Sequence, residues 1–280
     1  MAKKEKLCGE AGFNAFYENL FCERWQNLKN SMLAPVNHCQ WQNGSCKPYF
    51  LDSASILAAA SIPLERGKKI LDLCAAPGGK TLILASLMDS DATLVSNDRS
   101  PSRKMRLVKV CDESLPSEIR ERVNISCSDG AKWCTRQQEC FDRILLDAPC
   151  SSERHVLADA KYLAQWSASR VKTLAMEQWA LLSSAFRLLA PGGFLLYSTC
   201  ALSPAENDGV VERLFKKFDN ARCVFAELDT LPDVCQKIEP FSDARLPPAE
   251  KTKYGFHVLP DTCAGAGPLY FSLITKYSEA

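Results

Sequence analysis

The sequence predicts an α/β protein built around a doubly wound, mainly parallel sheet. From residue 69 onward, short apolar runs typical of buried strands alternate with segments of helical periodicity. Several of these runs end in Gly, Asp or Cys, residue types that form sites at the carboxyl edge of an open parallel sheet. The alternation indicates strand–helix–strand units rather than separate blocks of strands and helices.

A helical leader is expected over residues 1–63, followed by the main domain over residues 64–280. Aromatic side chains at helical spacing predict a helix over residues 10–34 and mark its packing face. Residues 35–50 contain two prolines and an Asn-Gly pair, which indicate a loop. Ser53 is then expected to cap a short apolar helix.

The main domain is expected to alternate strands with helices and to end in a pair of strands. The strands are expected at residues 69–73, 93–97, 123–127, 143–147 and 194–198, and the helices at 79–88, 101–111, 171–190 and 204–218. The segment between 147 and 168 is expected to be a polar loop. Two apolar runs, 222–226 and 269–275, flank a Pro-rich stretch at 240–268 and suit an antiparallel edge pair.

The composition favours a cytoplasmic protein with reduced thiols. A formal charge of +1 over 280 residues neither supports nor excludes a nucleic-acid partner. The chain lacks the apolar run of about 18 to 20 residues that a membrane helix needs. It starts without a secretory signal, and its early acidic residues argue against a mitochondrial transit peptide. Fourteen cysteines without a Cys-x-x-Cys pair, beside three histidines, favour core thiols over disulfides and predict no metal site.

A nucleotide-like cofactor is predicted at the first strand. The turn from Ala76 to Lys80 lacks both the dinucleotide glycine spacing and the P-loop pattern, although its two glycines allow close backbone approach. Asp98 and Asp129 end the next two strands, where carboxylates can accept hydrogen bonds from ribose hydroxyls and an adenine amine. A single strand-ending Asp is more often a turn or cap residue, but three consecutive strands that each end in glycine or an acid favour an adenosine-type cofactor.

Cys150 and Cys200 follow the two apolar strands at 143–147 and 194–198. Because carboxyl ends of neighbouring parallel strands meet at one edge, both thiols are expected to face one pocket. Each cysteine alone would be interpreted as a packing residue. Two thiols beside an activated cofactor instead suggest covalent catalysis.

Six motifs in order resemble the Sun-domain (Fmu-type) RNA cytosine-5 methyltransferases. They are LDLCAAPGGKT, NDRSPSR, SDGAKW, DAPCS, LLAPGGFLLYSTCALSPAEN and GPLYF. The details look similar to the mitochondrial small-subunit rRNA methyltransferase branch and its bacterial relatives. The resemblance implies a Rossmann-like class I S-adenosylmethionine-dependent methyltransferase fold with an antiparallel edge strand. It also implies a mitochondrial location if the chain belongs to an organellar branch.

The resemblance also assigns roles to residues. It makes Cys200 the nucleophile that adds to the cytosine ring, Cys150 the residue that assists product release, Asp147 a contact to the cytosine, and Lys80 a neighbour in that site. It assigns S-adenosylmethionine to Ala76, Pro77, Gly78, Gly79, Lys80, Asp98, Arg103, Asp129, Gly130 and Asp147. The chemistry asks for a hydrogen bond or proton at N3 of the ring, which Asp147 could supply if burial keeps it protonated.

Other functions stay open at this point. The substrate is expected to be RNA, with small-subunit rRNA favoured over tRNA, and the protein is expected to be a monomer. The leader, the basic helix at 101–111, or a protein partner would position the RNA, with Arg154, His155 and Lys161 as weaker contact candidates. Methylation of an exocyclic amine, of a protein side chain or of DNA cytosine fits the motifs less well. A non-catalytic RNA-binding ribosome-assembly factor is the alternative outside enzymes.

Overall fold

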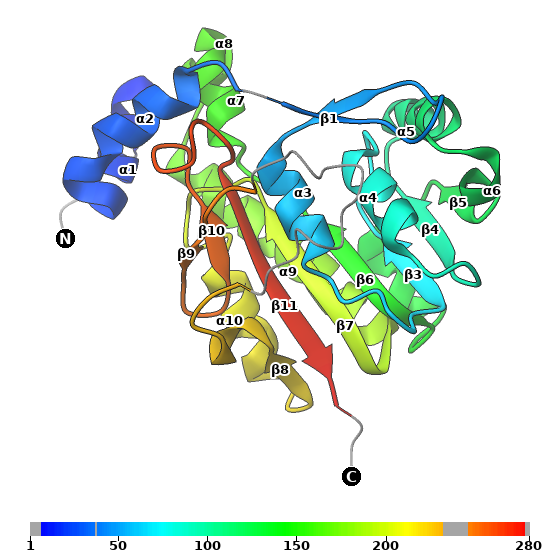
Figure 1. Cartoon of the computed structure of the whole chain (residues 1–280). Helices are drawn as coiled ribbons and strands as arrows, with labels where there is room; N and C mark the ends of the chain where they lie inside the picture. Colours follow the sequence, from blue (N-terminus) through cyan, green and yellow to red (C-terminus); the bar gives the residue numbers. More distant parts are fainter. Residues whose placement is uncertain (1–6, 37, 232–245, 278–280) are drawn as a thin grey trace.

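A computed structural model describes residues 7–36, 38–231 and 246–277. Figure 1 shows a central sheet with helices on both faces, as the alternating pattern predicts. The strands are β1 (Cys39–Trp41), β2 (Tyr49–Leu51), β3 (Lys69–Asp72), β4 (Thr93–Asn97), β5 (Val123–Ser126), β6 (Phe141–Asp147), β7 (Leu189–Thr199), β8 (Ala221–Cys223), β9 (Glu250–Lys251), β10 (Phe256–Val258) and β11 (Leu269–Lys276). The α-helices are α1 (Gly9–Phe21), α2 (Trp25–Leu33), α3 (Ser53–Ala60), α4 (Gly79–Leu87), α5 (Pro101–Ser114), α6 (Ser117–Arg120), α7 (Glu153–Ala158), α8 (Ala160–Ala164), α9 (Ala168–Leu188) and α10 (Asp208–Lys217). Short 3₁₀ turns are η1 (Cys22–Arg24), η2 (Gly130–Thr135) and η3 (Phe225–Glu227).

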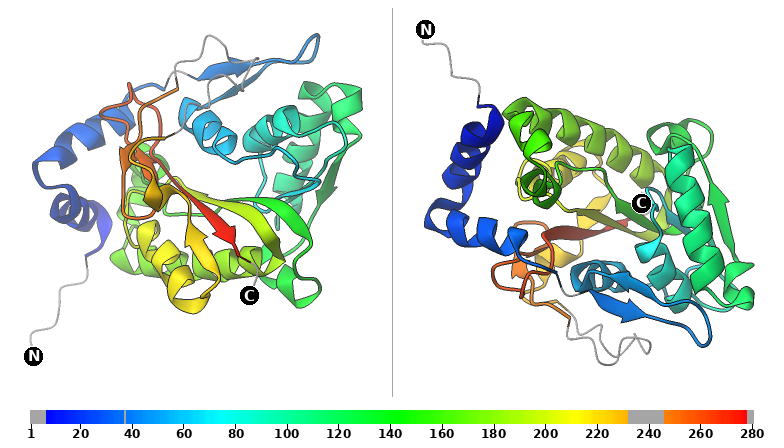
Figure 2. Two further views of the ribbon diagram at one scale, coloured as in Figure 1. Left: turned by 60° about the horizontal axis from the view of Figure 1, so that its bottom comes forward. Right: turned by 90° about the horizontal axis from the view of Figure 1, so that it is seen from above.

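Within the described residues, nine strands form the main sheet in the order β5-β4-β3-β6-β7-β11-β10-β9, and β8 pairs with β11. The ladders from β5 to β7 are parallel, which confirms the predicted fold class. Because the order reverses beside β3, the carboxyl ends of β3, β4 and β6 open into a crevice, where ligands bind in such sheets. Figure 2 shows the twist of this sheet and the helices on its two sides.

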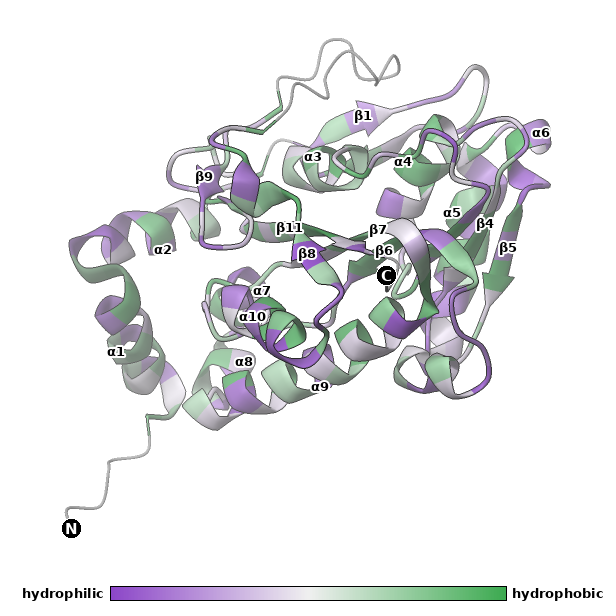
Figure 3. Cartoon of the chain, turned by 90° about the horizontal axis from the view of Figure 1, so that it is seen from below, coloured by the Kyte–Doolittle hydropathy of each residue, from purple (hydrophilic) through white to green (hydrophobic). Residues whose placement is uncertain are grey.

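The two faces of the sheet bury different residues of the same strands. Leu145 and Leu196 pack with α3, α4 and α5, whereas Leu146 and Leu195 pack with α9 and α10. Strands that are apolar on both faces are expected for a parallel sheet between two helical layers. Figure 3 shows this hydrophobic interior beneath the more polar outer turns of the helices.

The C-terminal strand β11 is more central than its sequence pattern indicates. The two apolar runs do pair antiparallel, as β8 and β11, but β11 also pairs antiparallel with β7 along Phe194–Thr199. The antiparallel edge of the sheet is therefore formed by β8, β9 and β10. Residues 240–245 of the expected Pro-rich stretch lie outside the described residues.

The aromatic residues of the leader form a packing face, as predicted, but on two helices rather than one. Phe13 and Tyr17 of α1 and Trp25 of α2 are buried against Trp166, which lies between α8 and α9. The two helices meet at η1, where Arg24 bonds to acidic residues near β9. Figure 1 shows both helices beside α7 and α8.

Two segments expected to be loops contain regular structure. β1 and β2 form an antiparallel hairpin over residues 39–51, which overlaps the loop expected at 35–50, and α7 and α8 lie between 147 and 168. The hairpin strands are only three residues long, so alternation had little length in which to show.

Two predicted helix boundaries were wrong. The side chain that caps α3 belongs to Asp52, which accepts a hydrogen bond from the Ala54 N–H at 2.8 Å, and Ser53 is already helical. Pro191-Gly192-Gly193 does not lie between α9 and the next strand, because β7 begins at Leu189 and includes it. Proline is tolerated near the start of a strand, where its missing N–H is not needed. Across the described ranges, no helix has the length and apolarity needed to span a membrane.

Candidate active site

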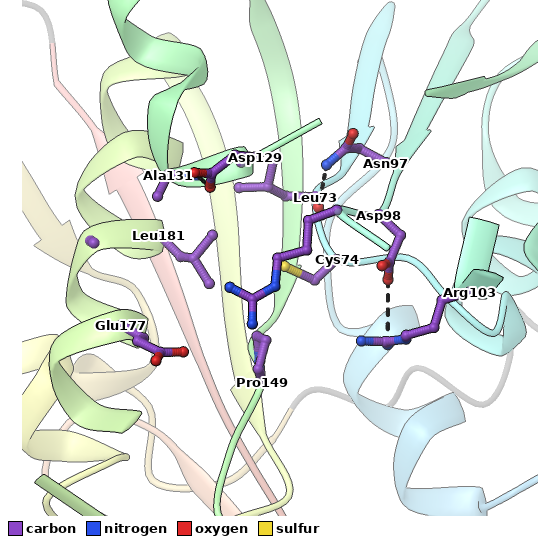
Figure 4. Close-up of a pocket in the computed structure, with 13 residues that line it drawn as sticks. Leu73, Cys74, Asn97, Asp98, Arg103, Asp129, Ala131, Pro149, Glu177 and Leu181 are labelled. Atoms are coloured by element: carbon purple, nitrogen blue, oxygen red, sulfur yellow. Dashed lines mark hydrogen bonds and ion pairs between the residues drawn. The ribbon is translucent and has the colours of Figure 1, made fainter. Parts of the chain in front are cut away.

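Carboxylates gather at the ends of β4 and β5 around a cavity of about 240 Å³, here called the carboxylate cavity. Asp98 is 2% exposed, and its Oδ2 lies 3.4 Å from a guanidinium nitrogen of Arg103. Asp129 caps η2 by accepting from the Ala131 N–H at 3.1 Å. Figure 4 shows these groups with Glu177 of α9 across the cavity. The cavity also has apolar walls, including Leu73 and Leu181.

Asn97 holds the ends of three strands together and was missed by sequence reasoning. Its amide donates to the carbonyls of Leu73 and Ser128 at 3.1 and 3.0 Å, and its Oδ1 accepts from the side chains of Ser126 and Ser128. The residue is 1% exposed, so these partners satisfy a buried amide. Its place just before Asp98 was the available signal, but an Asn at a strand end equally indicates a turn.

The glycine turn after β3 packs against α5. Gly78 has a φ of +122°, and a Cβ there would lie 3.1 Å from side-chain atoms of both Leu107 and Val110. Glycine at position 78 therefore allows both the positive φ of the turn and its close packing against α5. A Cβ on Gly130 would likewise lie 2.9 Å from Leu73, so that glycine lets η2 approach β3.

The predicted cofactor residues divide between two cavities. Asp98, Arg103, Asp129 and Gly130 line the carboxylate cavity. A smaller hairpin cavity of about 170 Å³, under β1 and β2, is lined by Ala76, Pro77, Gly79, Lys80 and Asp147. Arg103 connects the two groups because its guanidinium also donates to the carbonyl of Ala76. Gly78 lines neither cavity.

The two cysteines singled out from the sequence lie side by side. Cys200 directly follows β7 and Cys150 follows β6, and their Sγ atoms are 2.7 Å apart. The Ser152 Oγ lies 3.5 Å from Cys150 and 3.4 Å from Cys200. The hydrogen bond with Cys200 and burial raise the pKa of the Cys150 thiol. The raised pKa favours the protonated form of Cys150, and either sulfur can be the hydrogen-bond donor.

A salt bridge stands beside the thiols. Lys80 Nζ lies 2.7 Å from Asp147 Oδ2 and 3.2 Å from Ser55 Oγ, while Ser198 donates to Asp147 Oδ1 at 2.9 Å. Burial lowers the pKa of Lys80, but attraction to Asp147 outweighs it and the pKa is raised overall. The lysine is thus charged. Asp147 is half-buried and ion-paired, not the isolated buried acid that the sequence argument allowed.

The cavities form a connected row. A thiol cavity of about 280 Å³ shares Cys74, Arg103 and Pro149 with the carboxylate cavity. It shares Asp147, Ser152 and Cys200 with a larger lysine cavity of about 460 Å³. The thiols therefore lie between a carboxylate-lined space and a space that reaches the Lys80–Asp147 salt bridge.

Two buried acids tie the thiol loops together, and sequence reasoning missed both. Glu153 and Glu206 are each 0% exposed. The Ser151 hydroxyl lies within hydrogen-bond distance of both carboxylates, and Glu206 Oε2 accepts from the Ser151 N–H at 3.0 Å and from Gln178 at 2.8 Å. Glu153 accepts from the Leu202 N–H at 3.2 Å and from the Tyr17 hydroxyl. The network thus joins the residues after Cys150 and Cys200 to α1.

The three weaker candidates for RNA contacts have different surroundings. The Arg154 guanidinium is used inside the protein, donating to the carbonyls of Met32 at 3.1 Å and Gly265 at 2.6 Å. His155 is exposed at the lysine cavity, and Lys161 is exposed on α8. In the described part of the chain, no group of three His, Cys, Asp or Glu residues is arranged to hold a metal ion.

Comparison with known proteins identifies the family. The family model described as 16S rRNA methyltransferase RsmB/F matches residues 59–259. The chain belongs to this family. It is similar to the 5-cytosine rRNA methyltransferase NSUN4 of Bos taurus, with 34% identity over 228 residues, covering 80% of this chain and 58% of the relative. It is also similar to the mitochondrial tRNA (cytosine(34)-C(5))-methyltransferase of Danio rerio, with 33% identity, covering 81% of this chain and 60% of the relative. The chain therefore spans about three fifths of these relatives' length.

A solved structure supports the fold independently. The methyltransferase homologue protein from Pyrococcus horikoshii superimposes with a TM-score of 0.70 at 22% identity. The match covers 94% of each chain. The similarity therefore extends over nearly the whole of both chains and identifies the fold.

Proposed function

We propose that this protein is an S-adenosylmethionine-dependent RNA (cytosine-5) methyltransferase that acts on small-subunit rRNA. The observation that carries the proposal is the pair of sulfurs, 2.7 Å apart, beside the Lys80–Asp147 salt bridge. Addition to a pyrimidine ring requires a nucleophile, here a sulfur, beside a group that can give a proton to the ring, here the Lys80–Asp147 salt bridge. Membership of the RsmB/F family supports the same activity.

The carboxylate cavity fits the adenosine part of S-adenosylmethionine. Asp98 and Asp129 offer acceptors for ribose hydroxyls and for the adenine amine, and Leu73 and Leu181 offer apolar walls for the ring. Asp98, Arg103, Asp129 and Gly130 would hold the nucleoside, and Ala76 to Lys80 with Asp147 would surround the amino-acid part. When bound, the cofactor supplies an electrophilic methyl group.

Cys200 is the nucleophile in this proposal. Carbon 5 of cytosine is too weakly nucleophilic to take a methyl group unaided. When the Cys200 thiolate bonds to carbon 6, the electrons of the 5–6 double bond become available at carbon 5. The neighbouring Cys150 thiol keeps its proton and donates a hydrogen bond, which stabilises Cys200 as an anion.

Lys80 and Asp147 stabilise the negative charge that develops at N3 and the carbonyl oxygen of the ring. Addition at carbon 6 pushes electron density onto N3 and the carbonyl oxygen. The salt bridge carries a proton beside the lysine cavity, and a proton or hydrogen bond from it to N3 neutralises the density. The pair replaces a single protonated Asp147 in this role.

Cys150 acts in product release. After methyl transfer, a base removes the proton from carbon 5, the 5–6 double bond re-forms, and Cys200 leaves with the bonding electron pair. Once Cys200 is bonded to the ring it is no longer an anion, so it no longer opposes ionisation of Cys150. Cys150 or a water beside it then serves as the base.

In the proposed organisation, residues 64–280 form the catalytic domain, and the leader of residues 1–63 contributes to RNA positioning. The RsmB/F family favours small-subunit rRNA as the substrate. Transfer RNA is the second candidate because the chain is also similar to a mitochondrial tRNA methyltransferase. The same site chemistry would serve both RNAs.

Methyl transfer to unmodified transcripts of small-subunit rRNA and of tRNA tests the proposal, with bisulfite sequencing to locate each product. Wild-type protein should protect a cytosine in the rRNA from conversion, and Cys200→Ala should abolish that protection. Cys140→Ala is the matched control, because Cys140 precedes β6 at the opposite end from the thiol pair. If Cys200→Ala protein still protects the cytosine fully, Cys200 is not the nucleophile. If only the tRNA transcript is protected, tRNA rather than rRNA is the substrate.

A further inference from the structure

A further cavity opens next to the proposed target site. This aromatic cavity of about 380 Å³ lies between α7, α8 and the start of α9 and is lined by Ser151, Ser152, His155, Val156, Tyr162, Gln165, Trp166 and Arg170. Its volume is in the range of small-ligand sites, about 300 to 1,000 Å³. It adjoins the row of cavities that contains the thiols but takes no part in the mechanism above.

Trp166 forms the part of the cavity wall that packs on the leader. Trp166 is 2% exposed, and its indole N–H has no hydrogen-bond partner among the described residues. One side of the indole packs on α1, where Phe13 lies 5.3 Å away between ring centroids. This packing on α1 fixes one wall of the aromatic cavity.

The exposed rings of the cavity suit a flat ligand. His155 and Tyr162 have ring centroids 5.0 Å apart, and Tyr162 is 47% exposed. Both rings are accessible at the wall of the cavity and are available for stacking, which every nucleobase permits.

The positive charge at the aromatic cavity favours the phosphate backbone of a nucleic acid. Arg170 is exposed, and its side chain makes no hydrogen bond or ion pair within the described ranges. No Asp or Glu lines the cavity. A free guanidinium beside stacking rings matches a nucleotide, whose phosphate and base lie next to each other.

The position of the aromatic cavity indicates which nucleotide of the RNA it would bind. Ser152 and His155 line both the aromatic cavity and the lysine cavity, so the two share a wall. A strand whose cytosine enters the lysine cavity therefore passes this wall with its neighbouring residue. We propose that the aromatic cavity binds the base directly adjacent to the target cytosine and stacks it on Tyr162 and His155. This inference rests on the proposed function and extends it to a second base-binding site.

Equilibrium binding to short RNAs tests the second site. The probes are single-stranded oligouridine with one central cytidine, and two copies that lack the base on the 5′ or the 3′ side of that cytidine. Wild-type protein should bind one of the two abasic RNAs on the order of 10- to 100-fold more weakly than the intact RNA, the usual loss of one aromatic stack. Tyr162→Ala should weaken binding of intact RNA by a similar factor and should be insensitive to the abasic position.

Control variants separate stacking from damage to the fold. Tyr162→Phe keeps the ring and should restore wild-type affinity. Tyr277→Ala removes another exposed tyrosine, at the far end of β11, and should bind all three RNAs as wild type does. Equal binding of all three RNAs by wild type, or independent losses from Tyr162→Ala and the abasic site, would overturn the inference. Absence of measurable binding to the intact RNA would overturn it as well.

The same RNAs distinguish this inference from the proposed function. If wild-type protein transfers no methyl group to the central cytidine, the proposed activity on these substrates fails. The affinity pattern across the intact and abasic RNAs still reports on the aromatic cavity, because it requires no turnover.

Discussion

Replacing Glu206 by Gln should make the protein more stable at alkaline pH. Burial and the neighbouring charge of Glu153 raise the pKa of Glu206 from 4.5 to about 7. The folded protein therefore keeps a proton that the unfolded chain has already released. The contribution of Glu206 to stability consequently falls as pH rises from 4.5 to about 7.

The magnitude follows from the two pKa values. A rise from 4.5 to about 7 corresponds to about 3 kcal/mol of stability lost by the time Glu206 is ionised. A glutamine can keep the network, because its oxygen can accept from the Ser151 N–H and Gln178 while its amide donates to the Ser151 hydroxyl. Glu206→Gln should therefore match wild type near pH 4.5 and exceed it by about 3 kcal/mol at pH 8.

Urea unfolding between pH 4.5 and pH 8 measures this difference. Glu212→Gln is a control of opposite sign, because hydrogen bonds from Lys253 and Lys216 lower the pKa of exposed Glu212 to about 2. That variant should lose stability rather than gain it. If the free energies of unfolding of Glu206→Gln and wild type change with pH in the same way, ionisation of Glu206 does not destabilise the folded protein.

Two further predictions concern the reaction. Cys150→Ala should accumulate a covalent protein–RNA adduct, seen as a denaturant-resistant gel shift, because the base that releases Cys200 is lost. The Cys150→Ala, Cys200→Ala double variant is the control and should form no adduct. If the single variant also forms no adduct, Cys150 has no role in product release. Asp98→Ala should weaken S-adenosylmethionine binding by about 10- to 150-fold in calorimetry, the loss of one charged hydrogen bond, and unchanged affinity would take Asp98 out of the cofactor site.

Much of the fold could be predicted because the strands are apolar on both faces. The predicted strand at 93–97 has the bounds of β4, and the adjacency of Cys150 and Cys200 follows from the order of neighbouring parallel strands. The position of β11 was harder to predict, because pairing with β7 joins residues about seventy to eighty positions apart in the chain.

The supporting residues of the site could not be predicted. Glu153 and Glu206 are acids, which are usually exposed, and only the folded arrangement brings Ser151 between them. The aromatic cavity was equally hidden, since Tyr162 and Trp166 lie in a segment whose polar composition indicated a loop.

The placement of β11 bears on how fragments of this protein should be expressed. A fragment limited to residues 59–259 would omit Leu269–Lys276 and leave the backbone of Phe194–Thr199 in β7 unpaired on one side. Unpaired strands of this kind recruit other chains and promote aggregation. The last residue of that exposed strand is Thr199, directly before Cys200, so truncation would disturb the proposed nucleophile without any substitution in the site.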